Sequence, residues 1–412
     1  MERQPVELQF NTLMPMNIGR MACLSRFPVV PGDSMGAQIN SFFRLAQLRR
    51  PLTADVKVDI FAFFCPYRFT YPEWVQFIEQ GGSYTPTWPE ASGNRPEFMQ
   101  VAETPYPKHL WSDLANIYNQ WFRDPSFTEL SLDTPTTDAT TLIYGPRVSQ
   151  LKGWGTSQSQ LADLADTAFD IDTSNASISM YDIQAQQAKG RNAAYRMFIG
   201  SRYQEIISNM AEAPLHGYAD DVPELLWRES SWFSGYDING TAGADLGNSV
   251  GKAVCSVNFN MPRRLFVEHG TVYVMCVARM PPQYIQTKQY LDEFNRPYET
   301  LVPVGDTDMP PVELTLNDLF TNGSSTPVGY VPAYEWLRQH PSHVAERFHV
   351  QDAGWQYLVK PTTAQGLTET GDYSGFFFST PVGQMQASSS VRLEGFRPLP
   401  HPMGSVMADQ NA

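Results

Sequence analysis

The clearest pattern in the sequence is a run, residues 55–65, in which an alternation of apolar and polar residues turns into an unbroken apolar stretch. Val56, Val58 and Ile60 alternate with Lys57 and Asp59, and every residue from 61 to 65 is apolar. Alternation with a period of two predicts a β-strand with one face on a core, and the unbroken half predicts a strand covered on both faces. The chain is therefore expected to contain a strand deep inside a β-sandwich.

A second apolar region, residues 264–279, predicts two strands joined at a bend. The bend falls at His269 and Gly270, and both faces of the run that follows are nearly apolar. A strand of this kind belongs in the middle of a sheet that is covered on both sides. Residues 375–380 and 388–396 predict at least one closing strand near the end of the chain. The residues expected in the sandwich core are Phe61, Phe63, Phe64, Val272, Val274 and Cys276.

Helical patterns interrupt this β framework. Thr70 and Glu73 have the spacing of a capping box, which predicts a short helix after Thr70. Apolar residues recur with helical spacing over residues 114–122, which predicts an amphipathic helix over residues 110–124, and a third helical stretch is predicted over residues 179–212. Residues 86–107 are rich in proline and polar residues and predict a long loop. The length alone leaves one elaborated domain as plausible as two. Strands at both ends of the chain, with helices and loops between them, favour a single domain, residues 1–412, with large insertions between its strands.

The composition is low in charge and rich in aromatic residues. Of the 412 residues, 17% are charged and 13% are aromatic, whereas an average soluble domain has roughly 25% charged residues. Aromatic residues anchor interfaces between proteins, so burial against copies of the same chain is the simplest explanation. The formal net charge of −14 means that the molecule as a whole repels nucleic acid. Any contact with nucleic acid must come from a local basic patch or from a separate basic partner.

Patterns that would indicate an enzyme, a cofactor or a metal site are missing from the sequence. It contains no P-loop, no GxSxG motif and no GxGxxG motif between a strand and a helix. His340, His343 and His349 lie near Glu346, but their spacing is not that of a zinc motif, and His269 has no further ligands nearby. The sequence therefore predicts no catalytic, cofactor or metal site.

The cysteines and the N-terminus indicate a protein made in a reducing compartment. The four cysteines form no CxxC pair, and Cys65 and Cys276 lie in apolar runs, which predicts buried free thiols. The first residues lack the basic and apolar regions of a signal peptide, and no run approaches the roughly 20 apolar residues that a membrane span needs. The protein is expected to remain unsecreted.

Five blocks of the sequence carry a resemblance to a known family. They are the run from Leu48 to Leu52 with the following VDIFAFFCPYRFTY, then KHLWSDLANIYNQWF, SGYDINGT, PRRLFVEHGTVYV and RMPPQ. In these blocks the chain resembles the major capsid protein of the Microviridae, a family of small icosahedral phages with single-stranded DNA. The blocks keep the family's order and extend across most of the chain, and none of them is a catalytic motif.

The resemblance implies a fold and an assembly. The fold is an eight-stranded viral jelly-roll β-sandwich with long inserted loops and a few helices. The assembly is a T=1 icosahedral shell, built from pentamers, that encloses a circular single-stranded DNA genome. The gokushovirus branch of the family carries a large insertion for which 412 residues are too few, so the smooth-shelled branch is favoured. Residues 86–107 and 110–124 are then expected to be ordered mainly by neighbouring subunits, because long connections are costly to order alone.

The resemblance also implies partners. These are further copies of the chain in pentamers, the single-stranded DNA genome, a small basic DNA-packaging protein, a DNA pilot protein, scaffolding proteins and, in some lineages, a pentameric spike protein. The protein is expected in the virion, after assembly in the cytoplasm of the host bacterium. Sugars on the host surface are a further candidate partner. The resemblance implies no enzymatic activity and no cofactor.

Five arginines are the candidates for contact with the genome. A shell must accept a whole genome, so we expect contact through phosphates and stacked aromatic residues without sequence readout. The basic residues between positions 189 and 202 instead flank the apolar stripe of the third predicted helix, as ordinary solvated residues do. Arg49 and Arg50 lead because they stand next to Pro51 at the entry to a strand. The full set is Arg44, Arg49, Arg50, Arg263 and Arg264.

One alternative from another class stays open at this point. Sandwiches of this kind also serve as carbohydrate-binding proteins and glycosidases, and the aromatic residues would then stack on sugars. A lectin or a hydrolase stays a small oligomer, whereas a shell subunit sediments as a large particle containing DNA.

Overall fold

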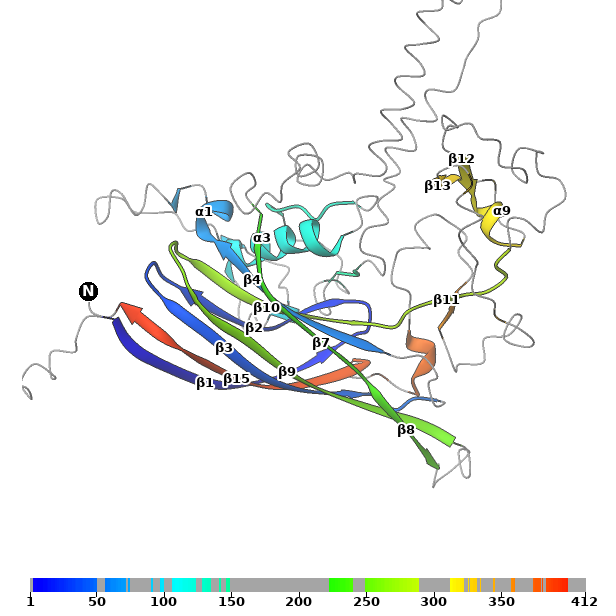
Figure 1. Cartoon of the computed structure of the whole chain (residues 1–412), viewed down its shortest axis with the longest axis horizontal. Helices are drawn as coiled ribbons and strands as arrows, with labels where there is room; N and C mark the ends of the chain where they lie inside the picture. Colours follow the sequence, from blue (N-terminus) through cyan, green and yellow to red (C-terminus); the bar gives the residue numbers. More distant parts are fainter. Residues whose placement is uncertain are drawn as a thin grey trace, which may run out of the picture.

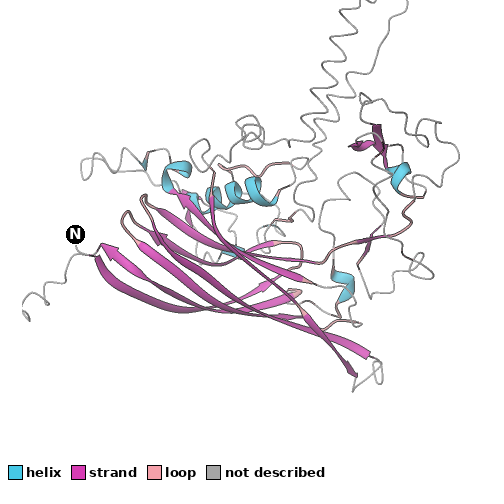
Figure 2. Cartoon of the chain, viewed as in Figure 1, coloured by secondary structure: helices cyan, strands magenta, loops and turns pink. Residues whose placement is uncertain are grey.

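The structure is a computed structural model of the chain (Figures 1 and 2). It describes residues 3–49, 56–71, 73–74, 90–91, 97–99, 106–123, 128–134, 141, 146–148, 222–239, 249–288, 312–321, 325, 327–331, 334, 344, 357–359, 373–378, 380 and 383–398. In this part of the chain, no helix has both the length and the apolar character needed to cross a membrane.

Two antiparallel sheets face each other (Figure 1), which confirms the prediction of a mainly β fold. Within the described residues, the larger sheet has five strands in the order β1-β15-β3-β9-β8, and the smaller has four in the order β2-β10-β4-β7. The strands of the larger sheet are β1 Arg3–Met16, β15 Met385–Pro398, β3 Ser34–Leu45, β9 Ser249–Leu265 and β8 Ser234–Asn239. Those of the smaller sheet are β2 Met21–Val29, β10 Gly270–Arg279, β4 Lys57–Pro66 and β7 Glu224–Trp232.

The two sheets share one hydrophobic core, which we call the inner core. In β3, Met35, Ile39 and Phe43 are buried between the sheets, whereas Gln38 and Asn40 point outward and are exposed. A strand with one face on a core shows this alternation, because successive side chains point to opposite faces. The inner core draws side chains from β1, β2, β3, β4, β9, β10 and β15. The arrangement is that of a β-sandwich.

A second core, the outer core, lies on the other face of the four-stranded sheet. Helix α3, Lys108–Ile117, packs there, on the side away from the five-stranded sheet (Figure 1). Strand β10 lies between β2 and β4 and is buried on both faces, as predicted for a strand in the middle of a sheet. The smaller sheet is therefore the wall between two cores.

The predicted core residues divide between these two cores. Successive residues of β4 point to opposite faces of the sheet, so a continuous apolar run supplies both cores alternately. Phe61 and Phe63 face the helix, and the prediction that they lie between the sheets was wrong. The prediction is confirmed for the members of the inner core, Phe64, Val272, Val274 and Cys276.

The helix predicted over residues 110–124 is present, and its own sheet orders it. Helix α3 continues into a π-helical turn, Tyr118–Phe122, and Leu114 and Ile117 are buried in the outer core. The ring of Phe122 meets those of Phe61 and Phe63 edge to face, with centroids 5.2 and 5.8 Å apart. The described apolar residues of the loop over 86–107, Phe98, Met99 and Tyr106, pack in the same core. The expectation that neighbouring subunits order these segments was therefore wrong for the described part.

Other local predictions had mixed outcomes. Helix α1, Tyr67–Thr70, ends at Thr70, whose hydroxyl donates to Asp113. Of the helix predicted after Thr70, the structure describes residues 73 and 74, of which Trp74 is helical, so the capping box stays a prediction. The closing strand is β15, whereas the described part of residues 375–380 forms a 3-10 turn, Ser374–Phe376, and no strand. The helix predicted over residues 179–212 lies outside the described residues. All four cysteines are free and buried, as predicted for Cys65 and Cys276.

Smaller elements complete the described chain. The two-stranded pairs are β5 Glu90–Ala91 with β6 Tyr106–Pro107, β11 Gln283–Tyr284 with β14 Leu358–Val359, and β12 Val312–Thr315 with β13 Pro327–Val331. Helix α9, Leu316–Leu319, begins with a capping box formed by Thr315 and Asp318, and a 3-10 turn covers Glu97–Met99. The helices lie outside the space between the two large sheets (Figure 2).

A buried carboxylate joins helix α3 to the sheet beneath it. Asp113 accepts hydrogen bonds from the hydroxyl of Tyr273 in β10 at 2.7 Å and from that of Thr70 in α1 at 2.9 Å. Asp113 and Tyr273 are both fully buried. Burial raises the pKa of Asp113 from 3.8 to about 7, although the two hydrogen bonds act in the opposite direction. The side chain therefore titrates near neutral pH.

Truncation of Phe63 should remove contacts in the outer core. Because the ring is fully buried, Phe63→Ala should lower the free energy of unfolding by about 3–5 kcal/mol, the range for large cavities in apolar cores. Urea unfolding of the unassembled subunit measures the change. The control is Phe42→Ala, since Phe42 is 49% exposed on β3 and its loss should cost less than about 1 kcal/mol. Equal effects of the two substitutions would contradict this assignment.

Asp113 should make the stability of the subunit depend on pH. A raised pKa in the folded state means that the folded protein binds the proton more tightly, so this contribution to stability is lost as the pH rises from about 4 through about 7. Asp113→Asn keeps the shape and removes the charge. The free energy of unfolding of the wild type minus that of the variant should fall as the pH rises from about 4 to about 7 and should be constant at higher pH. Thermal unfolding at several pH values measures this difference, and a pH-independent difference would refute the assignment.

Candidate nucleic-acid interface

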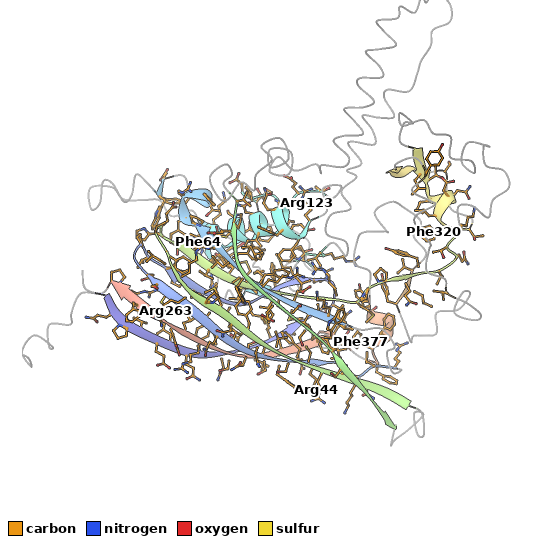
Figure 3. All side chains as sticks on the ribbon, in the orientation of Figure 1. Arg44, Phe64, Arg123, Arg263, Phe320 and Phe377 are labelled. Carbon is orange, nitrogen blue, oxygen red and sulfur yellow. The ribbon has the colours of Figure 1, made fainter. Side chains whose placement is uncertain are left out.

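The candidate arginines of the five-stranded sheet lie far apart. Arg44 is exposed on β3 and Arg263 is exposed on β9, toward different ends of the sheet (Figure 3). Arg44 pairs with Val254, and Arg263 lies nine residues further along the same strand. At about 3.3 Å per residue, the two positions are roughly 30 Å apart. They do not form one patch.

The remaining candidates are engaged in local contacts. The Nε of Arg49 donates to the carbonyl of Phe377 at 2.9 Å. Arg264 pairs with Glu224 at 2.7 Å, and the guanidinium of Arg263 lies 5.0 Å from the ring centre of Phe396. Arg50 lies outside the described residues, so its prediction is untested. The structure does not bring the predicted candidates together into one site.

The outward face of the five-stranded sheet is polar but weakly charged. Neighbouring strands present Gln38, Asn40 and Asn258 on this face, all exposed. Its arginine Arg392 is paired with two glutamates, Glu7 at 2.9 Å and Glu394 at 2.7 Å. This central region offers hydrogen bonds rather than net positive charge.

Three cations instead converge on the outer face of the four-stranded sheet. Arg279 Nη1 lies 2.9 Å from Asp59 Oδ2, while Arg228 Nη2 and Lys57 Nζ lie 3.1 and 3.3 Å from Asp59 Oδ1. The side chain of Asp59 is only 2% exposed. We call these four residues the Asp59 cluster.

Strand register explains why these residues meet. Lys57 and Asp59 stand two residues apart on β4 and so share a face. In the neighbouring strands, Arg279 of β10 pairs with Lys57, and Arg228 of β7 pairs with Phe61. Directly opposite residues point to the same side of a sheet. All the cations of the cluster therefore lie on the face that also carries Phe61.

The Asp59 cluster has an excess of positive charge. Three cations and one carboxylate leave a net charge of +2 at a site in a chain whose total is −14. Burial lowers the pKa of Arg279, and the nearby Asp59 opposes this shift. The Arg228 guanidinium also lies 5.2 Å from the ring centre of Phe61, a cation–π distance. The cluster is held in place by both charge and aromatic contact.

Sequence reasoning missed this cluster. Arg228 and Arg279 are isolated basic residues, far from Lys57 in the sequence, and only the pairing of β7, β4 and β10 brings them together. One signal was available, because an aspartate in an otherwise apolar strand needs a partner when it is buried. That signal gives no indication of which cations supply the partner.

The described residues show no metal site. Among them, no three histidine, cysteine, aspartate or glutamate side chains are grouped so as to hold a metal ion. His269 meets the ring of Trp74 at 5.3 Å, edge to face. His340, His343 and His349 lie outside the described residues.

Comparison with known proteins identifies the family. The sequence profile of the capsid protein (F protein) family matches residues 1–141 and 135–358. The chain belongs to this capsid protein family. Relatives include the capsid protein F of Escherichia phage G4, 28% identical, and those of Enterobacteria phage phiK and Escherichia phage alpha3, each 29% identical. Each comparison covers 98% of this chain and 98% of the relative.

Membership of this family fixes the class of function. The relatives are capsid proteins of Microviridae phages, which confirms the resemblance found in the sequence. The chain is a structural protein of the virion and not an enzyme. The glycosidase alternative is therefore set aside.

Removal of the central carboxylate should destabilise the capsid subunit. Asp59→Asn leaves three neighbouring cations without a counter-charge, so the free energy of unfolding should fall by about 3 kcal/mol. Added salt should recover part of this loss, because anions screen the repulsion. Urea unfolding at low and high salt measures both effects. The control is Glu268→Gln, which breaks an ion pair with Arg68 that is more than 40% exposed on each side and should cost less than about 1 kcal/mol.

Proposed function

We propose that this chain is a major capsid protein that assembles, through pentamers, into a T=1 icosahedral shell around a circular single-stranded DNA genome. The observation that carries the proposal is the match to phage capsid proteins over 98% of both chains. The low charge and high aromatic content fit a protein that buries much of its surface against copies of itself.

We propose further that the sandwich is an eight-stranded jelly roll within a single domain, residues 1–412. The order β1-β15-β3-β9 in one sheet and β2-β10-β4-β7 in the other supports this. A jelly roll combines two Greek keys in eight strands, so strands distant in sequence pair side by side. Strand β15 lies between β1 and β3, and β10 lies between β2 and β4, as that wiring requires.

An exposed apolar corner of the sandwich supports the assembly part of the proposal. Val267 is 74% exposed and Leu265 is 48% exposed, both at the turn between β9 and β10. Phe396 of β15, 38% exposed, lies near Leu265 at the same end of the strands, since Phe396 and Leu265 both pair with Ser34 at the start of β3. Arg263 covers the Phe396 ring. Apolar anchors beside an arginine are the composition of interface hot spots, and we propose that a second copy of the chain covers this corner.

The genome and its helper proteins complete the proposal. Because the chain carries a net charge of −14, a small basic DNA-packaging protein would supply most of the neutralisation of phosphate. Of the arginines predicted from the sequence, Arg44, Arg49, Arg50 and Arg264 would contribute local contacts, whereas Arg263 would be covered by the second copy of the chain. A DNA pilot protein, scaffolding proteins and a pentameric spike protein are proposed as further partners, with assembly in the host cytoplasm. Host-surface sugars are proposed as an external ligand of the finished particle.

Electron microscopy of purified material tests the assembly. The chain, produced with its phage's other structural proteins, should form small uniform spheres that contain DNA, whereas a sugar-binding protein would remain a small oligomer. Val267→Asp should reduce the yield of particles at least 10-fold, because it puts a charge into an apolar contact. Val267→Ile keeps the apolar surface and should assemble normally. Circular dichroism of the unassembled variants checks that both fold, and normal assembly of Val267→Asp would remove this corner from the interface.

A further inference from the structure

The Asp59 cluster reaches the surface beside an exposed aromatic ring. Trp232, in β7, pairs directly with Lys57 and is 53% exposed. The ammonium of Lys57 lies 5.7 Å from the centre of the Trp232 ring. The side chains of Lys57 and Arg228 are 28% and 48% exposed. Two cations and a flat apolar ring are thus open to solvent at one place on the sheet.

This combination matches the chemistry of one nucleotide in a single strand. A phosphate needs positive charge and N–H donors, which Lys57 and Arg228 provide. An unpaired base has two exposed faces that stack on aromatic side chains, whatever its sequence. An acidic peptide would use the cations but would have no need of the ring. The ring beside the cations therefore favours nucleic acid over a carboxylate-bearing segment.

We propose that Lys57, Arg228 and Trp232 form a binding site for a nucleotide unit of single-stranded DNA, with its phosphate on the two cations and its base on the tryptophan. The inference rests on the proposed function, since it names a contact that a DNA-enclosing shell makes. It lies on the outer face of the four-stranded sheet, whereas Arg44 and Arg263 are exposed on the five-stranded sheet, on the other side of the sandwich. A shell wall turns one of these sides to the genome, and the inference selects the side of the four-stranded sheet. Binding at this site requires no particular base. A capsid that encloses a whole genome needs contacts of this kind, because every sequence must fit inside it.

The buried partners of the site hold it ready for the ligand. Asp59 fixes both exposed cations through its Oδ1, and Phe61 supports the guanidinium of Arg228 from below. Arg279 occupies the other carboxylate oxygen, Oδ2. The single negative charge of Asp59 is thus shared among three cations, and an excess of positive charge is left for an incoming phosphate. A site arranged before binding loses less entropy when the ligand arrives.

No second carboxylate opposes a phosphate within the described register of this face. Glu229 of β7 pairs with Ile60, whose side chain lies in the inner core, so Glu229 belongs to the opposite side of the sheet. Ser230 pairs with Asp59 and is exposed on the same face as the cluster. Its hydroxyl adds a neutral hydrogen-bonding group between the two cations.

Binding of a labelled oligothymidine of about eight nucleotides to the full-length chain tests the site. Fluorescence anisotropy at several salt concentrations gives the dissociation constant and its salt dependence. Trp232→Ala should weaken binding about 10-fold, the value of one stacked base. Arg228→Gln should weaken binding and lower the slope of log K against log salt by about one, the loss of one phosphate contact.

Two variants provide matched controls. Trp227 lies on the same strand and is 39% exposed, but it pairs with Ala62 of the inner core and so points to the other side. Arg68 is exposed to a similar degree as Arg228, away from the cluster. Trp227→Ala and Arg68→Gln should bind the oligonucleotide as the wild type does.

The outcomes separate this inference from the proposed function. Unchanged oligonucleotide binding by Trp232→Ala and Arg228→Gln would overturn the site, even if DNA-containing particles form normally. Loss of particle assembly in these variants, with oligonucleotide binding intact, would show that the patch is a contact between copies of the chain and would overturn it as well. Failure of the wild-type chain to form particles would instead count against the proposed function.

Discussion

The burial of both faces of the four-stranded sheet is the constraint on which the rest of the structure depends. Neighbouring residues of β4, such as Ile60 and Phe61, point into different cores, and the same holds along β10. Each large apolar side chain buried in this way contributes roughly 1.5–3 kcal/mol. The inner core requires the five-stranded sheet, and the outer core requires helix α3. Neither neighbour can be removed without exposing the apolar side chains on one side of β4 and β10.

The same constraint bears on two carboxylates that are buried at the outer face of this sheet, Asp113 of α3 and Asp59 of β4. Among the described residues, the hydroxyl groups of Tyr273 and Thr70 donate to the oxygens of Asp113, and burial raises the pKa of this carboxyl toward neutrality. Asp59 lies on the same face near the start of β4, but three cations surround it. One carboxylate thus fastens a helix to the sheet, while the other gathers positive charge at the surface. The difference lies in the partners that the neighbouring strands and helix α1 supply, not in the aspartates themselves.

The elements that depend on a local sequence pattern could be predicted. The features that depend on which strands pair with each other could not. The apolar runs of β4 and β10 and the periodicity of α3 were sufficient to predict those elements. The pattern also predicted that β4 and β10 are buried on both faces. It did not show which neighbouring element covers each face, so Phe61 and Phe63 were assigned to the wrong core. Strand β3 was overlooked although Met35, Ile39 and Phe43 alternate cleanly with polar residues. The alternation was missed because the polar residues of β3 make the strand as a whole only weakly hydrophobic.

The candidate nucleic-acid interface also depends on strand pairing that could not be predicted from the sequence. Arg49 and Arg50 were chosen because they stand next to Pro51 at the predicted entry to a strand, yet Arg49 donates a hydrogen bond to the backbone of Phe377. The cations that do meet, Lys57, Arg228 and Arg279, come from three strands. The resemblance to a capsid family supplied the class of function, which neither charge nor periodicity could have specified. It did not supply the position of any contact with DNA.

The alternation of β4 between two cores also bears on how the sequence can change over time. A substitution at an outer-core position such as Phe63 alters the fit against α3 and leaves the five-stranded sheet untouched. A substitution at an inner-core position such as Ile60 is felt by the facing sheet and not by the helix. Adjacent residues of β4 therefore pack against different elements. A substitution at one of them would be compensated by changes in a different part of the chain than a substitution at the next. The fold therefore allows the helical covering to change while the sandwich stays the same.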